Sequence, residues 1–159
     1  MKKTILSILL LCSTLLAEVK NVEVTPEFVK EKKFKIIDIR TEDEWREMGV
    51  ISEAYLITFF TKNNEYNIEF FLKELNTVIE EDEEFAIISN SSSRTKLVSN
   101  FLGHKHNYKV INLLGGMSKL LKEGYEVEVY KPHKKKEDNF IHLKSEKLEL
   151  KFNDNNITE

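Results

Sequence analysis

Residues 85–95 have the sequence FAIISNSSSRT, in which an apolar run is followed at once by a polar, serine-rich run. Phe85–Ile88 is short and wholly apolar, which is typical of a strand buried on both faces. After the polar run, Leu97, Val98 and Phe101 recur at helical spacing and predict a helix over 94–102 that ends at Gly103. Ser89–Ser93 is therefore expected to form a loop between a strand and a helix.

The same alternation continues on both sides of this stretch. Strands are expected at 22–24, 34–39, 55–60 and 109–113, and helices at 26–32, 42–48, 67–80 and 117–121. Thr25-Pro26 and the capping box Thr41–Glu44 mark the starts of two of these helices. Strands that alternate with helices predict an α/β fold, with a central, mostly parallel sheet and helices on both faces.

The first seventeen residues, MKKTILSILLLCSTLLA, have a basic start, an apolar stretch and a small residue at the end. This series is typical of a signal peptide, and its apolar stretch is shorter than the about 20 residues of a membrane-spanning helix. We expect residues 1–17 to be cleaved off and the protein to be periplasmic or secreted, without membrane contact after cleavage. The alternatives are an uncleaved anchor, which Leu15 favours, and a lipoprotein site at Cys12, which the bulky Leu11 disfavours.

Cleavage would leave one domain over 18–130, followed by a basic linker and C-terminal extension over 131–159. Residues 131–136 have the sequence KPHKKK, and apolar residues then alternate with polar ones over 141–143 and 148–152. That two-residue period indicates either a β-hairpin or a loosely ordered tail. Loss of Lys2 and Lys3 takes the net charge from -3 to -5, which favours neither nucleic acid nor an anionic membrane as a partner.

Three motifs occur in the order and spacing found in a known domain family. Ile36-Ile37-Asp38-Ile39-Arg40 is followed by Glu44-Trp45, Ser89 is separated from Arg94 by four residues, and Asn112–Met117 contains Gly115-Gly116. Together they resemble the rhodanese-like (sulfurtransferase) domain over about residues 20–128. The resemblance implies a three-layer α/β fold whose strand-to-helix loop carries the active-site cysteine.

Ser89 stands where the family has that cysteine, and the chain's only cysteine is Cys12, in the expected signal peptide. The resemblance implies that a thiolate takes a sulfane sulfur and passes it to a second thiophile. A serine hydroxyl stays protonated near neutral pH without an adjacent base, and oxygen does not store sulfur as a persulfide. We therefore expect no catalytic residue and no sulfurtransferase turnover. The alternative is sulfur transfer that uses a thiol from a partner.

The loop keeps the means to bind an anion, because its backbone N–H groups and the following helix N-terminus favour negative charge. We predict an anion-binding loop formed by Ser89, Asn90, Ser91, Ser92, Ser93 and Arg94. Its partner would be sulfate, thiosulfate or phosphate, or else a periplasmic protein. Arg94 either binds the oxyanion or braces the loop. Asp38 and Arg40 are expected to support the loop rather than to meet a ligand.

Other kinds of site find little support in the sequence. Ser89 lies in no G-x-S-x-G motif and has no identifiable base, which speaks against a serine hydrolase. Phosphatase loops of similar design are one residue longer and also need the thiolate. His104 and His106 are expected in a surface loop without further ligands, so we predict no metal site and no cofactor.

Overall fold

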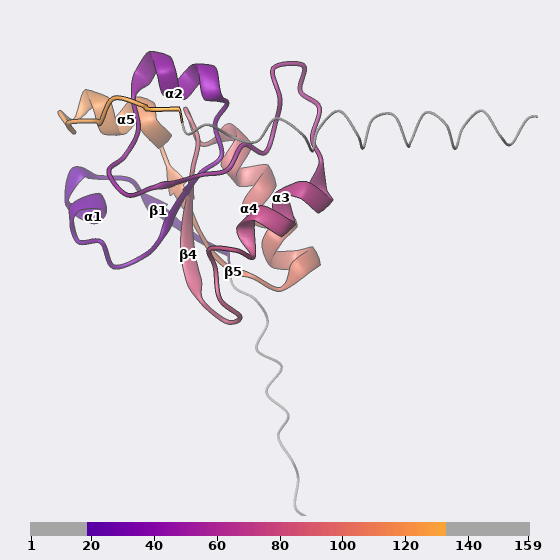
Figure 1. The fold of residues 1–159 in the computed structure, drawn as a ribbon. Helices are drawn as coiled ribbons and strands as arrows, with labels where there is room; N and C mark the ends of the chain where they lie inside the picture. Colours follow the sequence, from indigo (N-terminus) through magenta and orange to yellow (C-terminus); the bar gives the residue numbers. More distant parts are fainter. Residues whose placement is uncertain (1–18, 133–159) are drawn as a thin grey trace, which may run out of the picture.

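The structure is a computed structural model, which describes residues 19–132. Five parallel strands form its centre (Figure 1). The strands are β1 (Val19–Glu23), β2 (Ile36–Asp38), β3 (Tyr55–Leu56), β4 (Glu84–Ile88) and β5 (Lys109–Leu114). They lie in the order β1-β5-β4-β2-β3, and every neighbouring pair is parallel. The parallel sheet predicted from the alternating pattern is confirmed.

Helices cover both faces of this sheet (Figure 1). They are α1 (Pro26–Lys30), α2 (Glu42–Met48), α3 (Ile68–Leu75), α4 (Ser93–His106) and α5 (Gly116–Lys122). Side chains of α3 and α4 pack with Phe85 and Ile87 in one core cluster, whereas those of α1 and α5 pack with Ala86 and Ile88 in the other. Successive strand residues point to opposite faces, so a strand that is apolar at every position serves both clusters.

The predicted helix starts are confirmed at atomic detail. The Thr25 hydroxyl accepts a hydrogen bond from the N–H of Phe28, with Pro26 at the first helical position. At α2 the Thr41 hydroxyl accepts from the N–H of Glu44, while the Glu44 carboxylate accepts from the N–H of Thr41 (3.0 Å). These local bonds satisfy helix-end N–H groups that would otherwise lack a partner.

The helix predicted over 94–102 is longer than expected. α4 continues through Gly103 to His106 and ends at Asn107, whose φ of 60° is left-handed. A Cβ at position 103 would lie 2.5 Å from Cγ2 of Val19, so glycine here lets β1 approach the helix and does not terminate it. His104 and His106, predicted for a loop, are exposed residues of the last helical turn.

The buried face of α4 also differs from the prediction, because Leu97 is 61% exposed. The helix buries Val98, as predicted, together with Thr95, Ser99 and Leu102. Thr95 and Ser99 fit this face because their hydroxyls donate to backbone oxygens of the same segment, Ser92 O at 2.9 Å and Lys96 O at 3.2 Å. Buried hydroxyls that are paired in this way cost little.

Four elements are shorter than predicted: the helix expected over 26–32 is Pro26–Lys30 and the strand expected over 34–39 is Ile36–Asp38, while two others differ by more. The strand expected over 55–60 is paired in the sheet only at Tyr55–Leu56, and the helix expected over 67–80 ends at Leu75. Turns follow α3 and bring Ile79 into the core.

The predicted signal peptide and nearly all of the extension over 131–159 lie outside the described residues. Between residues 19 and 132, the helices are too short and too polar to cross a membrane.

Candidate functional site

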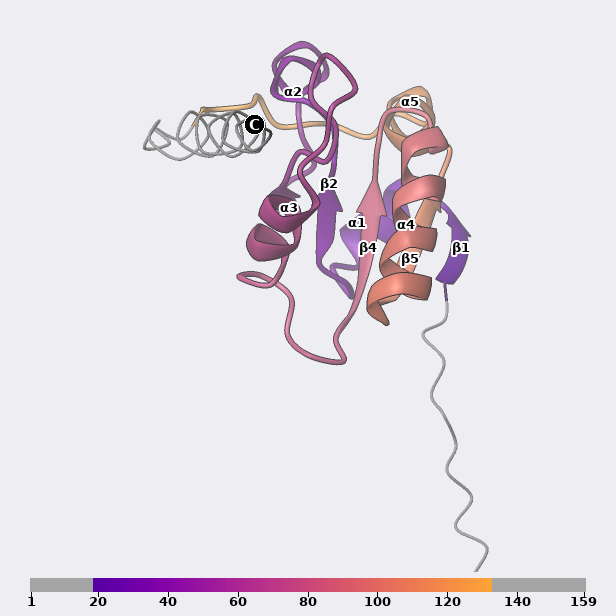
Figure 2. The same cartoon turned by 90° about the vertical axis from the view of Figure 1, so that its right-hand side faces the viewer.

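The 89–94 loop lies at the carboxyl end of the central strand, because Ser89 directly follows β4 and α4 begins at Ser93 (Figure 2). Open parallel sheets of α/β proteins bind their ligands outside the carboxyl ends of the strands. The predicted anion-binding residues are thus contiguous in the chain and lie at the position in the fold where a ligand is expected.

The start of α5 fixes the orientation of this loop. The N–H of Met117 donates to Ser89 O and the N–H of Ser118 donates to Asn90 O, both at 2.9 Å. Gly116, with φ of 61°, permits this approach, since a Cβ there would lie 2.4 Å from Ser89 O. In a trans peptide the C=O and the next N–H point in opposite directions. The amides of Asn90 and Ser91 therefore point away from α5.

Consecutive N–H groups of the loop are left without protein partners. In the part of the chain that the structure describes, no group accepts a hydrogen bond from the N–H of Asn90, Ser91 or Ser92. The first N–H groups of α4 have no intrahelical acceptor by helix geometry. Ser92 is left-handed (φ 66°) and provides no side-chain cap. This row of free donors is what the anion-binding hypothesis requires, although binding itself stays a prediction.

The side chain of Ser89 is fully buried, and its hydroxyl has no hydrogen-bond partner within residues 19–132. Three other polar side chains of the loop do have partners: Ser118 Oγ donates to Asn90 Oδ1 at 2.6 Å, and the hydroxyls of Ser91 and Ser93 lie 3.3 Å apart. An unpaired buried hydroxyl costs about 1–3 kcal/mol. The described residues thus leave the hydrogen-bonding capacity of the Ser89 hydroxyl unused, and contact with a ligand stays a prediction.

Arg94 holds the loop to α2 through a two-pronged ion pair. Its Nη1 donates to Glu44 Oε2 at 2.8 Å and its Nη2 donates to Glu44 Oε1 at 2.5 Å, with both side chains mostly buried. Of the two roles expected for Arg94, bracing is the one that these contacts describe. The pair also neutralises the guanidinium, so the loop offers mainly neutral donors to a ligand.

Glu44 was not among the predicted site residues, although the structure places it directly against the loop. Burial by itself raises the pKa of Glu44, but the hydrogen bonds from Arg94 and from the Thr41 N–H outweigh it and lower the pKa from 4.5 to about 2. The carboxylate therefore stays ionised at physiological pH. In sequence, Glu44 shows only the capping-box pattern, which gives no sign of a partner fifty residues away.

We expect Glu44→Gln to destabilise the domain by about 1–2 kcal/mol at pH 7, after discounting the pKa shift for solvent screening. Because the folded pKa lies below the unfolded one, this stability is fully present above pH 4.5 and is lost as the pH falls through about 2. Urea unfolding should show less than half of the difference at pH 3. Glu42→Gln, in an exposed pair with Arg46, is the control and should change little. A difference that is independent of pH would contradict the assignment.

Asp38 and Arg40 form a fully buried ion pair below α2. Arg40 donates from Nε and Nη2 to the Asp38 carboxylate (2.6–3.0 Å) and from Nη2 to Gly49 O (2.8 Å). The pair therefore anchors the end of α2. Arg40 Nη1 also donates to Glu44 O at 3.5 Å, and support of the 89–94 loop by this pair stays a prediction.

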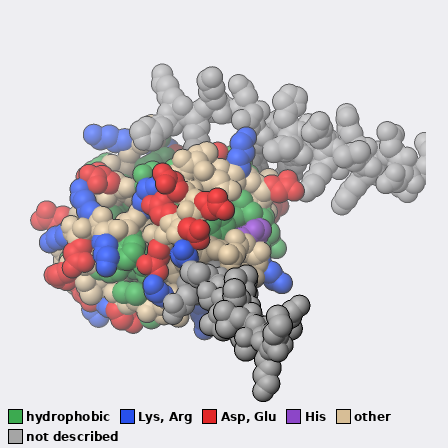
Figure 3. Space-filling model, turned by 90° about the horizontal axis from the view of Figure 1, so that it is seen from below, with side chains coloured by type: hydrophobic (Ala, Val, Ile, Leu, Met, Phe, Trp, Pro, Cys, Tyr) green, Lys and Arg blue, Asp and Glu red, His purple; other side chains and the backbone are tan. Residues whose placement is uncertain are grey.

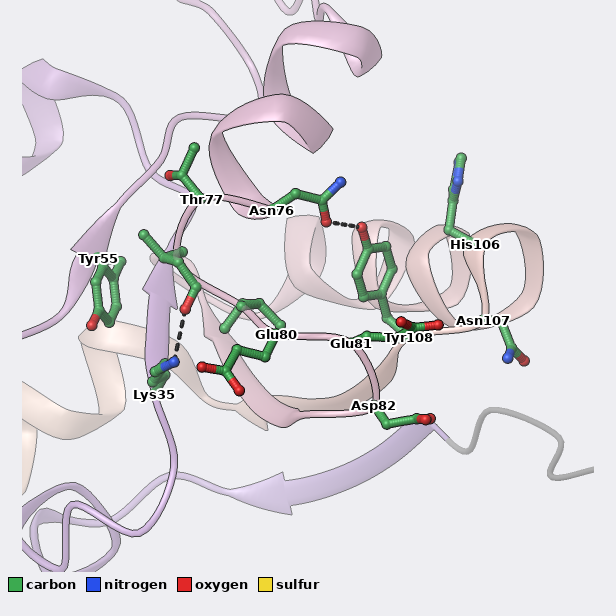
Figure 4. A pocket seen from close by; sticks show the side chains of 12 residues that line it. Lys35, Tyr55, Asn76, Thr77, Glu80, Glu81, Asp82, His106, Asn107 and Tyr108 are labelled. Atoms are coloured by element: carbon green, nitrogen blue, oxygen red, sulfur yellow. Dashed lines mark hydrogen bonds between the residues drawn. The ribbon is translucent and has the colours of Figure 1, made fainter.

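A separate groove of about 940 Å³ opens at the opposite end of the sheet (Figure 4). Two of its polar side chains are paired: Lys35 donates to Val78 O at 2.8 Å, and the Tyr108 hydroxyl donates to Asn76 Oδ1 at 2.5 Å. Figure 3, which views this end, shows acidic and basic side chains intermixed. Since the groove lies at the amino ends of the strands, it is not part of the site around Ser89.

No three metal-ligating side chains gather anywhere between residues 19 and 132.

Comparison with known proteins shows what this chain is similar to. A model of the rhodanese-like domain family matches residues 23–123, a range that contains the whole 89–94 loop. A rhodanese-like domain protein from Staphylococcus aureus is 24% identical, with 69% of this chain and 98% of that chain covered and a TM-score of 0.49. A rhodanese-related protein from Thermoplasma volcanium is 19% identical (68% and 98% covered, TM-score 0.50). The rhodanese-like domain of an Anabaena protein is 17% identical (74% and 88% covered, TM-score 0.51). No curated protein matches the chain.

Proposed function

Because this chain belongs to the rhodanese-like domain family, we propose that Ser89 takes the place of the family's catalytic cysteine and that the 89–94 loop binds a small oxyanion. In this proposal the domain has no sulfur-transfer chemistry of its own. No cysteine follows Cys12 in the sequence, so no other thiol of the chain can replace the missing one.

The observation that carries the proposal is the buried, unpartnered hydroxyl of Ser89 beside a row of free N–H groups. A tetrahedral oxyanion would accept hydrogen bonds from both at once. Its charge would be stabilised by the amide dipoles and the N-terminus of α4. Because Glu44 neutralises Arg94, we expect weak binding with little preference for higher anion charge.

Isothermal titration with sulfate, thiosulfate and phosphate at constant ionic strength tests this proposal. Heat of binding is expected for the parent chain, and several-fold weaker binding for Ser89→Ala. The same variant should unfold at equal or higher urea concentration, since it removes an unpaired buried hydroxyl. The only tryptophan, Trp45, adjoins Glu44 and gives a second, fluorescent readout.

Absence of heat and of a fluorescence change with all three anions would remove the oxyanion and leave a protein-binding domain. Equal binding by Ser89→Ala would show that the Ser89 hydroxyl is not a donor to the ligand. Thiosulfate-to-cyanide transfer that appears only when a thiol-bearing sulfur-carrier protein is added would replace the proposal by sulfur transfer with a partner's thiol.

We also propose that the protein is exported and works in the periplasm or outside the cell, on the strength of the first seventeen residues. N-terminal sequencing of the protein recovered from a periplasmic extract should begin at Glu18. A chain that keeps Met1 and sediments with membranes would favour the uncleaved anchor instead.

A further inference from the structure

An exposed apolar surface lies between α4 and the segment that precedes α3. Leu97 and Tyr66 are 61% and 58% exposed. Phe101 follows Leu97 by one turn on the same face of α4, and its ring lies 6.3 Å from Phe59. The Phe59 ring is also 5.8 Å from Tyr66 and 4.8 Å from Phe60. Tyr66 and Leu97, which are exposed, and Phe60 and Phe101, which are half-buried against the core, are called the apolar patch below.

The apolar patch borders the 89–94 loop. Leu97 lies one turn after Arg94 on the same face of α4, and Arg94 contacts Glu44 of α2. Large exposed apolar side chains that gather in one place mark interaction surfaces more often than isolated ones do. A segment bound to this patch would therefore lie beside the proposed anion site.

Tyr130, near the end of the described residues, contacts α2 next to a hollow that leads toward the apolar patch. The ring of Tyr130 packs 5.5 Å from Trp45, and its hydroxyl donates to Glu42 at 3.2 Å. Glu42 and Asp43 form one wall of a hollow of about 250 Å³, and residues 58–62 form the other. Lys62 pairs with Asp43 across this hollow. Figure 2 shows the segment of residues 58–66, which also carries Phe60 and Tyr66, beside α2.

The residues that follow Tyr130 are long enough to reach this patch. The run KPHKKK over 131–136 is basic, but the carboxylates of the first turn of α2 already pair with Arg46, Lys62 and Arg94, so the match is one of length and not of charge. The eleven residues from Tyr130 to Ile141 span at most about 35 Å when extended. A domain of this size has a radius of gyration of about 13 Å. The patch is therefore within reach of residue 141.

From these observations we propose that the segment of residues 141–152, IHLKSEKLELKF, docks on the apolar patch of its own chain. The segment has two runs with two-residue spacing, Ile141 and Leu143 and then Leu148, Leu150 and Phe152, and each run puts its apolar side chains on one side of an extended chain. The apolar side chains of this segment are removed from water if they pack on an apolar surface, and the apolar patch is such a surface. The proposal does not depend on oxyanion binding.

Engineered cysteines test this docking in the full chain with Cys12→Ser, which carries no other thiol. Under mild oxidation at low micromolar concentration, Leu97→Cys with Leu150→Cys should form an intramolecular disulfide in a monomer. The matched control is Glu81→Cys, an exposed residue at the opposite end of the sheet, with Leu150→Cys. We expect the first pair to cross-link at least about tenfold faster.

Adding Leu148→Ser and Phe152→Ser to the first pair should slow its cross-linking several-fold, because the apolar side of the segment is lost. Similar rates for the two cysteine pairs, or no effect of the serine substitutions, would overturn the proposal, since a freely moving tail would explain both. Disulfides that form only between molecules and rise with concentration would also overturn it and indicate a second copy as the occupant.

Discussion

Replacing Ser89 with cysteine is expected to give the domain a thiosulfate-to-cyanide sulfur transfer that the parent chain lacks. The new thiolate would attack the outer sulfur of thiosulfate, so that the S–S bond breaks and sulfite leaves. Cyanide would then take the outer sulfur of the persulfide, forming thiocyanate and regenerating the thiolate. The free N–H groups of the loop and the N-terminus of α4 would lower the pKa of the thiol and hold the anionic donor.

Thiocyanate formation should be measured on the parent, Ser89→Cys and Ser91→Cys. The comparison shows whether activity needs a thiol at position 89 or only a thiol somewhere in the loop. Ser91→Cys carries the same thiol two residues further along the loop, on an exposed residue, and should stay at background. We expect at least about a hundredfold difference between the two cysteine variants, of the order that one well-placed catalytic interaction supplies. Turnover by the parent would refute the proposed lack of sulfur-transfer chemistry. If Ser89→Cys is folded but silent, the amides of the loop do not stabilise a thiolate.

Asp38→Ala is expected to destabilise the domain by about 3–5 kcal/mol, because it leaves the guanidinium of Arg40 buried without its partner. Asp38 and Arg40 are both 0% exposed, so water does not replace the lost carboxylate. The loss is a large part of the 5–15 kcal/mol that stabilises a typical domain. Urea unfolding followed by Trp45 fluorescence measures it.

Asp38→Ala combined with Arg40→Leu should recover part of this loss, since removing both charges avoids an unpaired one. Asp43→Ala, which breaks an exposed pair with Lys62, is the control and should cost less than about 1 kcal/mol. A cost for Asp38→Ala as small as that of the control would mean that Arg40 finds water or another acceptor. The buried pair would then not be what anchors α2.

Much of the fold follows from patterns that lie within a few residues of one another. The apolar strand before Ser89, the capping box at Thr41 and the glycines at 115–116 each predict one local structure, and each is observed. Their alternation favours a parallel sheet, because a helix between two strands supplies the crossover connection that parallel strands need. The position of the 89–94 loop follows in turn, since the carboxyl ends of parallel strands share one edge.

Predictions about the limits and faces of helices were less successful where contacts distant in sequence decide. Gly103 has the appearance of a helix terminator, yet it lies within α4, where its lack of a side chain gives Val19 room to pack against the helix. Leu97 has the spacing of a core residue, yet it is exposed because the sheet contacts the side of α4 that carries Thr95 and Ser99. Neither outcome is encoded within one turn of helix.

The sequence by itself determined that Ser89 follows a buried strand and that Arg94 lies five residues later on a helix. Only the tertiary structure decided what surrounds these residues. It brings Glu44 to Arg94, turns the carbonyls of Ser89 and Asn90 toward α5, and leaves the Ser89 hydroxyl without a partner. The physical reason is that strand and helix propensities arise from neighbouring residues, whereas charge pairing and amide orientation depend on which elements pack together.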